Sequence, residues 1–123
     1  MSRPETPANP DLSLRDLAEW AAGESRRIAA NFSFDSPTDF VLAHAVKLGE
    51  EVGELHAEVL GALKYQRAEK AGQFSSDTLG GEIADVIVCL ALLADVHDVD
   101  LTQAVSRKIE QLEARNGQGE ITV

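Results

Sequence analysis

Apolar residues recur at alternating steps of four and three along residues 41–62, and this spacing restricts the fold more than any other feature of the chain. The positions are Val41, Ala45, Leu48, Val52, Leu55, Val59 and Ala62. Such steps put one apolar seam along an α-helix, and the seam is typical of a helix packed nearly parallel or antiparallel to its neighbours. Ser36 and Pro37 suit the N-cap and the first helical position. We therefore expect a helix that begins there and ends between residues 61 and 66.

Two further segments carry the same kind of pattern at either end of the chain. Asp11 can cap a helix that runs to about residue 30. Asp100 can open another helix, which ends near residues 116–117. The apolar positions of this last helix are expected to face inward: Leu101, Val105, Ile109 and Leu112. Together with the segment described next, these patterns predict an all-α protein, a four-helix bundle.

The remaining segment begins at Ser76 or Asp77, runs to Val96, and is apolar around nearly its whole circumference after Asp85. We interpret it as a helix, because its apolar stretch is longer than most strands and no other segment offers a pairing partner. Three neighbouring helices in a small monomer do not cover so much apolar surface. We therefore expect a second copy to cover part of it, in a homodimer or a homotetramer built as a dimer of dimers.

The chain of 123 residues has the size of one domain. Residues 1–10, which include three prolines, are expected to form a disordered arm, residues 11–116 the domain, and residues 117–123 a frayed tail. The start lacks the apolar stretch of a signal peptide, and the longest apolar run, Val86–Ala94, is too short to cross a bilayer. We expect a soluble, cytoplasmic protein. The single cysteine, Cys89, lies in this apolar run and fits a reducing compartment.

Acidic residues outnumber basic ones by 21 to 11, which gives a formal net charge of −10. This balance disfavours binding to nucleic acid or to an anionic membrane surface. Five of the acids form two clusters at helical spacing beside apolar sequence: Glu50, Glu51 and Glu54, then Glu82 and Asp85. Residues three or four apart share one helix face. Like charges at the border of a core repel one another. A bound Mg²⁺ ion, which prefers carboxylate oxygens, commonly neutralises such a group.

These two clusters, with Glu82 lying 28 positions after Glu54, resemble the signature of the MazG-like all-α nucleoside triphosphate pyrophosphohydrolases. The likeness covers most of residues 38–115 and includes the apolar run after Asp85 and the Asp-Leu start of the last helix. It implies a four-helix fold of that type. It also implies Mg²⁺-dependent hydrolysis, with Mn²⁺ as a substitute, of a nucleoside or deoxynucleoside triphosphate to monophosphate and pyrophosphate. Sanitation of the nucleotide pool is one task that such an activity would serve.

The resemblance assigns roles to individual residues. The metal ligands are expected to be Glu51, Glu54, Glu82 and Asp85. Glu50 lies on the flank of its cluster, and we assign it to orient or deprotonate the attacking water, with a role as a further ligand as the alternative. The expected substrate contacts are Lys47, Lys108 and Arg115 for the phosphates, with His44 and Trp20 as further candidates. At Leu112 many relatives have asparagine, so the preferred base stays open.

Two other functions fit the same residues. Phosphoribosyl-ATP pyrophosphohydrolase belongs to the same helical superfamily and cuts the same kind of bond. The second alternative is a non-catalytic helical module whose acidic residues bind a metal ion or face the solvent. A ferritin-like di-iron bundle is excluded, because it needs a histidine three residues after a glutamate, and none of the three histidines has one.

Overall fold

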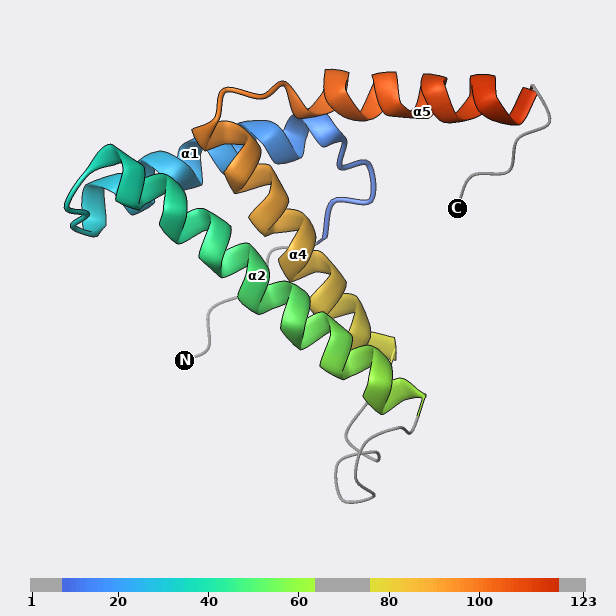
Figure 1. The fold of residues 1–123 in the computed structure, drawn as a ribbon, viewed down its shortest axis with the longest axis horizontal. Coiled ribbons are helices and arrows are strands. Elements are labelled where there is room, and N and C mark those ends of the chain that lie inside the picture. Colours follow the sequence, from blue (N-terminus) through green and yellow to red (C-terminus); the bar gives the residue numbers. More distant parts are fainter. Residues whose placement is uncertain (1–7, 64–75, 118–123) are drawn as a thin grey trace.

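The computed structural model describes residues 8–63 and 76–117, and all its regular structure in these ranges is helical (Figure 1). Four helices follow one another: α1 (Leu14–Asn31), α2 (Pro37–Ala62), α4 (Ser76–Val96) and α5 (Leu101–Gly117). Within the described ranges, the prediction of an all-α protein with four helices is confirmed. The expected disordered arm, the frayed tail and the segment that joins α2 to α4 fall wholly or mostly outside the described ranges. Within those ranges, each helix is too short or too polar to span a membrane.

Local capping fixes where α2 and α5 begin, as the sequence predicts. The Ser36 hydroxyl accepts a hydrogen bond from the backbone N–H of Asp39 at 3.1 Å, and Pro37 occupies the first helical position. Asp100 Oδ1 accepts from the backbone N–H of Gln103 at 2.9 Å. Each bond satisfies one of the backbone donors that a helix start leaves free. The predicted end of α2 and start of α4 are also confirmed.

The predicted cap of α1 is wrong, because Ser13 takes the place expected for Asp11. The Ser13 hydroxyl accepts from the Asp16 backbone N–H at 3.1 Å, and the Asp16 carboxylate accepts from the Ser13 backbone N–H at 3.0 Å. This reciprocal capping box satisfies two backbone donors at once, whereas a lone aspartate satisfies one. Asp11 lies before the helix and donates its backbone N–H to the Asn9 side chain at 3.0 Å.

Two long helices form the frame of the molecule. α2 and α4 run side by side in opposite directions, α1 packs across α4, and α5 contacts α1 and then extends outward (Figure 1). The buried centre is small: Leu17 and Ala21 of α1 meet Ala91 of α4, and Leu92 and Leu101 pack against them. α1 crosses the pair near the end of α4 that leads to α5 (Figure 1). Among the described residues, the other end of the pair is held by contacts between α2 and α4.

Large apolar side chains remain exposed on α4. Ile83, Ile87 and Leu90, which we call the α4 strip, are 43%, 45% and 45% exposed. Their steps of four and three place them on one helix face. On α5, Ile109 was expected to face inward, and this is wrong within one chain, because its side chain is half exposed. The apolar faces of α4 and α5 are therefore covered only in part by the described residues of one chain.

Candidate metal centre

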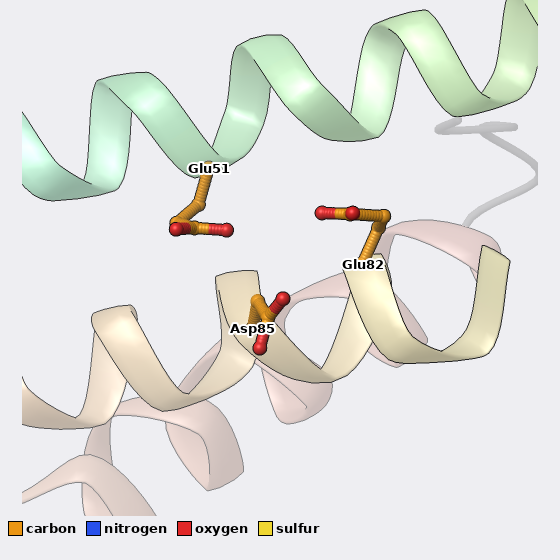
Figure 2. Close-up of side chains that lie close together, drawn as sticks. All are labelled: Glu51, Glu82 and Asp85. Atoms are coloured by element: carbon orange, nitrogen blue, oxygen red, sulfur yellow. The ribbon is translucent and has the colours of Figure 1, made fainter. Parts of the chain in front are cut away.

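Carboxylates from two helices come together between α2 and α4. Glu51 extends from α2, while Glu82 and Asp85 extend toward it from α4 (Figure 2). One carboxylate oxygen from each residue lies within 4.8 Å of the other two. Glu82 and Asp85 share a helix face because they are three residues apart, and the antiparallel packing brings that face opposite Glu51. Three of the four residues expected to bind metal thus form one group, which we call the carboxylate cluster.

Glu51 is the most buried member of the carboxylate cluster, with 7% of its surface exposed. Its Oε1 lies 3.1 Å from the Lys47 ammonium, one helical turn earlier. The hydrogen bond and the charge of Glu51, followed by the charges of Glu50 and Glu54, raise the pKa of Lys47. The second oxygen, Oε2, is buried and meets no hydrogen-bond donor among the described residues. Since a buried carboxylate oxygen without a partner is costly, Glu51 calls for a further positive group.

Glu82 carries the clearest electrostatic sign of uncompensated negative charge. Its removal from water raises its pKa most, and the negative charges of Glu54, Asp85, Glu51 and Glu58 raise it further. Its Oε2 is buried, and the described part of the chain gives that atom no hydrogen-bond partner. A raised carboxyl pKa means that the folded protein resists ionisation at this position. A bound cation would reverse that preference.

Two more glutamates of α2 border the carboxylate cluster. Glu54, the fourth expected ligand, is exposed, and its charge is the largest electrostatic cause of the raised pKa of Glu82. Glu58 was not among the expected ligands, but its charge also raises that pKa. Within the described ranges its Oε1 is buried without a hydrogen-bond partner. The signal was present in the sequence, because Glu51, Glu54 and Glu58 continue one polar stripe at steps of three and four.

The structure places the other expected site residues farther out. Glu50 is 60% exposed, and its carboxylate lies 3.8 Å from Lys47, on the flank of the cluster. Lys108 and Arg115 are exposed on α5, which extends away from the α2–α4 pair (Figure 1). Trp20 is half exposed on α1. Within one chain, Lys47 is therefore the expected phosphate-binding residue that the structure places beside the carboxylates.

His44 lies on the face of α2 that also carries Glu51, and it is 8% exposed. Its Nδ1 lies 2.8 Å from the backbone oxygen of Phe40. The ring of Phe40 meets the imidazole edge to face, with centroids 4.6 Å apart, and the ring of Phe34 meets Phe40 in the same way at 5.0 Å. Nε2 of His44 is buried and, among the described residues, has no hydrogen-bond partner. These contacts fix the imidazole in one orientation.

Comparisons with protein-family models, with curated proteins and with solved structures find no match.

The donor set of the cluster fits a hard divalent cation. Mg²⁺ takes oxygen ligands at about 2.0–2.1 Å, so two oxygens on one ion lie at most about 4.2 Å apart. Oxygens already within 4.8 Å of one another need only small side-chain rotations to reach that geometry. Buried oxygens of Glu51 and Glu82 would gain the positive partner that the rest of the described chain does not give them. The arrangement suits a cation better than it suits three ionised carboxylates alone.

Proposed function

We propose that this protein binds Mg²⁺ at the carboxylate cluster and hydrolyses a nucleoside triphosphate to a monophosphate and pyrophosphate. One observation carries the proposal: Glu51, Glu82 and Asp85 bring oxygens from two helices within 4.8 Å of one another, and buried oxygens of Glu51 and Glu82 meet no donor in the described ranges. Glu54 is the fourth ligand, and Glu58 supports the ligands from the same stripe. The resemblance of the two acidic segments supports the choice of reaction.

The charge of the protein supports a metal-dependent reaction on a polyanion. A triphosphate is repelled by a chain of net charge −10, and most strongly by a cluster of carboxylates. A divalent ion held there by Glu51, Glu82 and Asp85 would neutralise phosphate charge and make a water easier to deprotonate. Water attacks the α-phosphorus, the bond from that phosphorus to the bridging oxygen breaks, and pyrophosphate leaves with the bond electrons.

The residues around the cluster take separate parts in this reaction. Lys47 contacts a phosphate oxygen with an ammonium that already lies 3.1 Å from the cluster. Glu50 lies beside Lys47 on the solvent side, where it can accept a proton from the attacking water. Binding of the metal ions therefore falls to the carboxylates between α2 and α4, and proton transfer falls to Glu50 on the flank.

A panel of ribonucleoside and deoxyribonucleoside triphosphates, incubated with Mg²⁺, tests the reaction. The expected products are monophosphate and pyrophosphate in equal amounts. Release of diphosphate and orthophosphate would contradict the proposed bond cleavage. A second candidate, a metal-binding module without turnover, is favoured by the placement of Lys108 and Arg115 on an outward helix (Figure 1). It predicts cation binding and no product with any nucleotide.

We also propose that a second copy of this chain covers the α4 strip. The strip is free of charged side chains. Glu82 and Asp85 lie on a different face of α4, which turns toward α2 (Figure 2). The exposed isoleucine and leucine side chains of the strip offer a second copy an apolar surface to pack against. In a two-fold contact, the α4 strip of one copy packs against the α4 strip of the other. The two strongly acidic molecules then meet through an uncharged face.

A further inference from the structure

The side of α2 that faces away from α4 is apolar. Glu51 extends toward α4 and marks the inner side of α2 (Figure 2). Successive residues of a helix are about 100° apart, so Leu42 and Leu60, each nine positions from Glu51, lie on the opposite side. Gly49 and Gly53, each two positions from Glu51, lie there too. We call this side the outer face of α2, and its residues are Leu42, Val46, Gly49, Gly53 and Leu60.

The described residues leave the outer face uncovered. Leu42, Val46 and Leu60 are 54%, 61% and 46% exposed. Among the described helices, α2 packs chiefly against α4, on its other side (Figure 1). The outer face carries no charged residue, although the protein has a net charge of −10. Large apolar side chains that line up on one uncharged face, instead of lying scattered, indicate a contact with another molecule.

The two glycines of the outer face indicate that this contact is close. A glycine inside a helix is less favourable than an alanine, because its backbone loses more freedom on folding. The packing of one chain does not call for glycine here, since a Cβ at Gly49 or Gly53 would meet no neighbouring atom of the described chain within 4 Å. Without side chains at these positions, however, the backbone of another helix can approach α2 closely.

The order of residues on the outer face identifies the other helix as α2 of a second copy. Counted from Glu51 in either direction, a glycine stands two positions away and a leucine nine positions away. In a two-fold contact, residue i of one copy meets residue j of the other, and j meets i. Two antiparallel α2 helices that cross level with Glu51 therefore place Gly49 opposite Gly53. In the same contact Leu42 lies opposite Leu60.

We propose that two copies of this chain pack antiparallel through the outer face of α2, and that this contact joins two dimers into a tetramer. The inference rests on the proposed contact of the α4 strip for the dimer and adds the surface by which dimers associate. From Leu42 to Leu60 the outer face is about 27 Å long and about 10 Å wide. A stable interface covers about 800 Å² of each partner, so a single contact of this size is weak. Between two dimers the contact forms twice, which strengthens it.

Light scattering coupled to size exclusion, at rising protein concentration, measures the assembly. We expect the wild type to reach the mass of four chains of 13.2 kDa each, and to return to two chains on dilution. Gly53→Leu fills the point of closest approach with an apolar side chain, and Leu42→Asp places a charge opposite Leu60 of the other copy. Both variants should stop at two chains. The control Leu12→Asp, at an exposed apolar position before α1, should still reach four.

Thermal unfolding of Gly53→Leu distinguishes a lost contact from a lost fold. Position 53 has open space around it in the described chain, and leucine favours a helix more than glycine does. At a concentration where the wild type is a dimer, the variant should therefore unfold at an equal or higher temperature. A Gly53→Leu protein that still reaches four chains overturns the proposal. A lower unfolding temperature also overturns it, because the glycine would then be needed within one chain.

The α4 contact can fail separately from the α2 contact. If the wild type stops at two chains that dissociate only in Ile87→Asp, the α4 contact stands and the contact through the outer face is wrong. If the two chains dissociate only in Leu42→Asp, pairing through the outer face stands and the α4 contact is wrong. A wild type that is a monomer at every concentration overturns both. Product analysis with nucleoside triphosphates tests the proposed reaction independently of these masses.

Discussion

The ammonium of Lys47 lies 3.1 Å from Oε1 of Glu51, one turn away on α2, and it neutralises only part of the negative charge around Glu51. Lys47 is 60% exposed and brings one positive charge, while Glu51, Glu82 and Asp85 bring three negative charges within 4.8 Å. An exposed lysine contributes little to stability by itself. The carboxylate cluster therefore keeps most of its repulsion in the protein alone and would gain stability from a bound divalent cation. Several consequences can be measured.

Asp85→Asn removes one charge of the carboxylate cluster and keeps the shape of the side chain. We expect turnover to fall by about 100-fold or more. Replacing a residue that only hydrogen-bonds to a metal ligand already lowers metal affinity or activity by about 10–100-fold. Because repulsion is relieved, the variant without metal should unfold at a higher temperature than the wild type. Product analysis and thermal unfolding in a chelator measure the two effects. Glu113→Gln, on exposed α5, removes the same charge away from the cluster and is the control. Full activity in Asp85→Asn would contradict the site.

The raised pKa of Glu82 predicts how stability depends on pH. Because its pKa in the folded protein lies above the ordinary 4.5, the folded state binds the proton more strongly than the unfolded state does. The contribution of Glu82 to the stability of the metal-free protein is then fully present below pH 4.5 and is lost as pH rises through the raised value. Thermal unfolding of wild type and Glu82→Gln in a chelator measures this. The wild type should lose more stability between acid and neutral pH than the variant, and Mg²⁺ should reverse the difference. Equal losses of stability in the two proteins would mean that the ionised form of Glu82 does not destabilise the folded state.

The parts of the fold that depend on neighbouring residues could be predicted from the sequence. Ser36 with Pro37, and Asp100 with Gln103, act within one turn, so both helix starts were predictable. Around Ser13 two possible caps lie two residues apart, and the reciprocal bonds with Asp16 decide between them. The spacing of acids along each helix is local in the same way.

The parts that depend on how helices pack could not be derived from local patterns. Glu58 belongs to the stripe of Glu51, but its place beside Glu82 follows from the register between α2 and α4, which the sequence does not encode over a few residues. Ile109 belongs to an apolar stripe, and its exposure follows from where α5 leaves α1 (Figure 1). The buried Nε2 of His44 similarly depends on side chains from several segments.

Glu58 and Glu50 provide a matched pair that separates metal binding from proton transfer. Glu58→Gln should weaken Mg²⁺ or Mn²⁺ binding by about tenfold, since it supports the ligands from the border of the cluster. Glu50→Gln, on the exposed flank, should leave metal affinity unchanged and lower turnover by about 10²-fold, the typical effect of losing a general base. Calorimetry measures the affinities, and initial rates at saturating metal measure the turnover. If Glu50→Gln lost metal affinity and Glu58→Gln kept it, Glu50 would support metal binding, which contradicts its assignment to proton transfer.

The α4 strip predicts the oligomeric state. If a second copy covers Ile83, Ile87 and Leu90, the protein in solution should have at least twice the 13.2 kDa of one chain. Ile87→Asp places a carboxylate at the centre of the strip. Across a two-fold axis the two introduced charges would face each other in an apolar contact, which costs several kcal/mol, so the variant should be a monomer. Light scattering coupled to size exclusion measures both masses.

The matched control is Leu12→Asp, which puts the same charge at an exposed apolar position before α1. It should keep the wild-type mass, because it lies outside the strip. Circular dichroism distinguishes a folded Ile87→Asp monomer from an unfolded chain. A wild-type protein that stays at the mass of one chain up to high concentration would contradict a second copy on α4, and the exposed isoleucines would then need another partner.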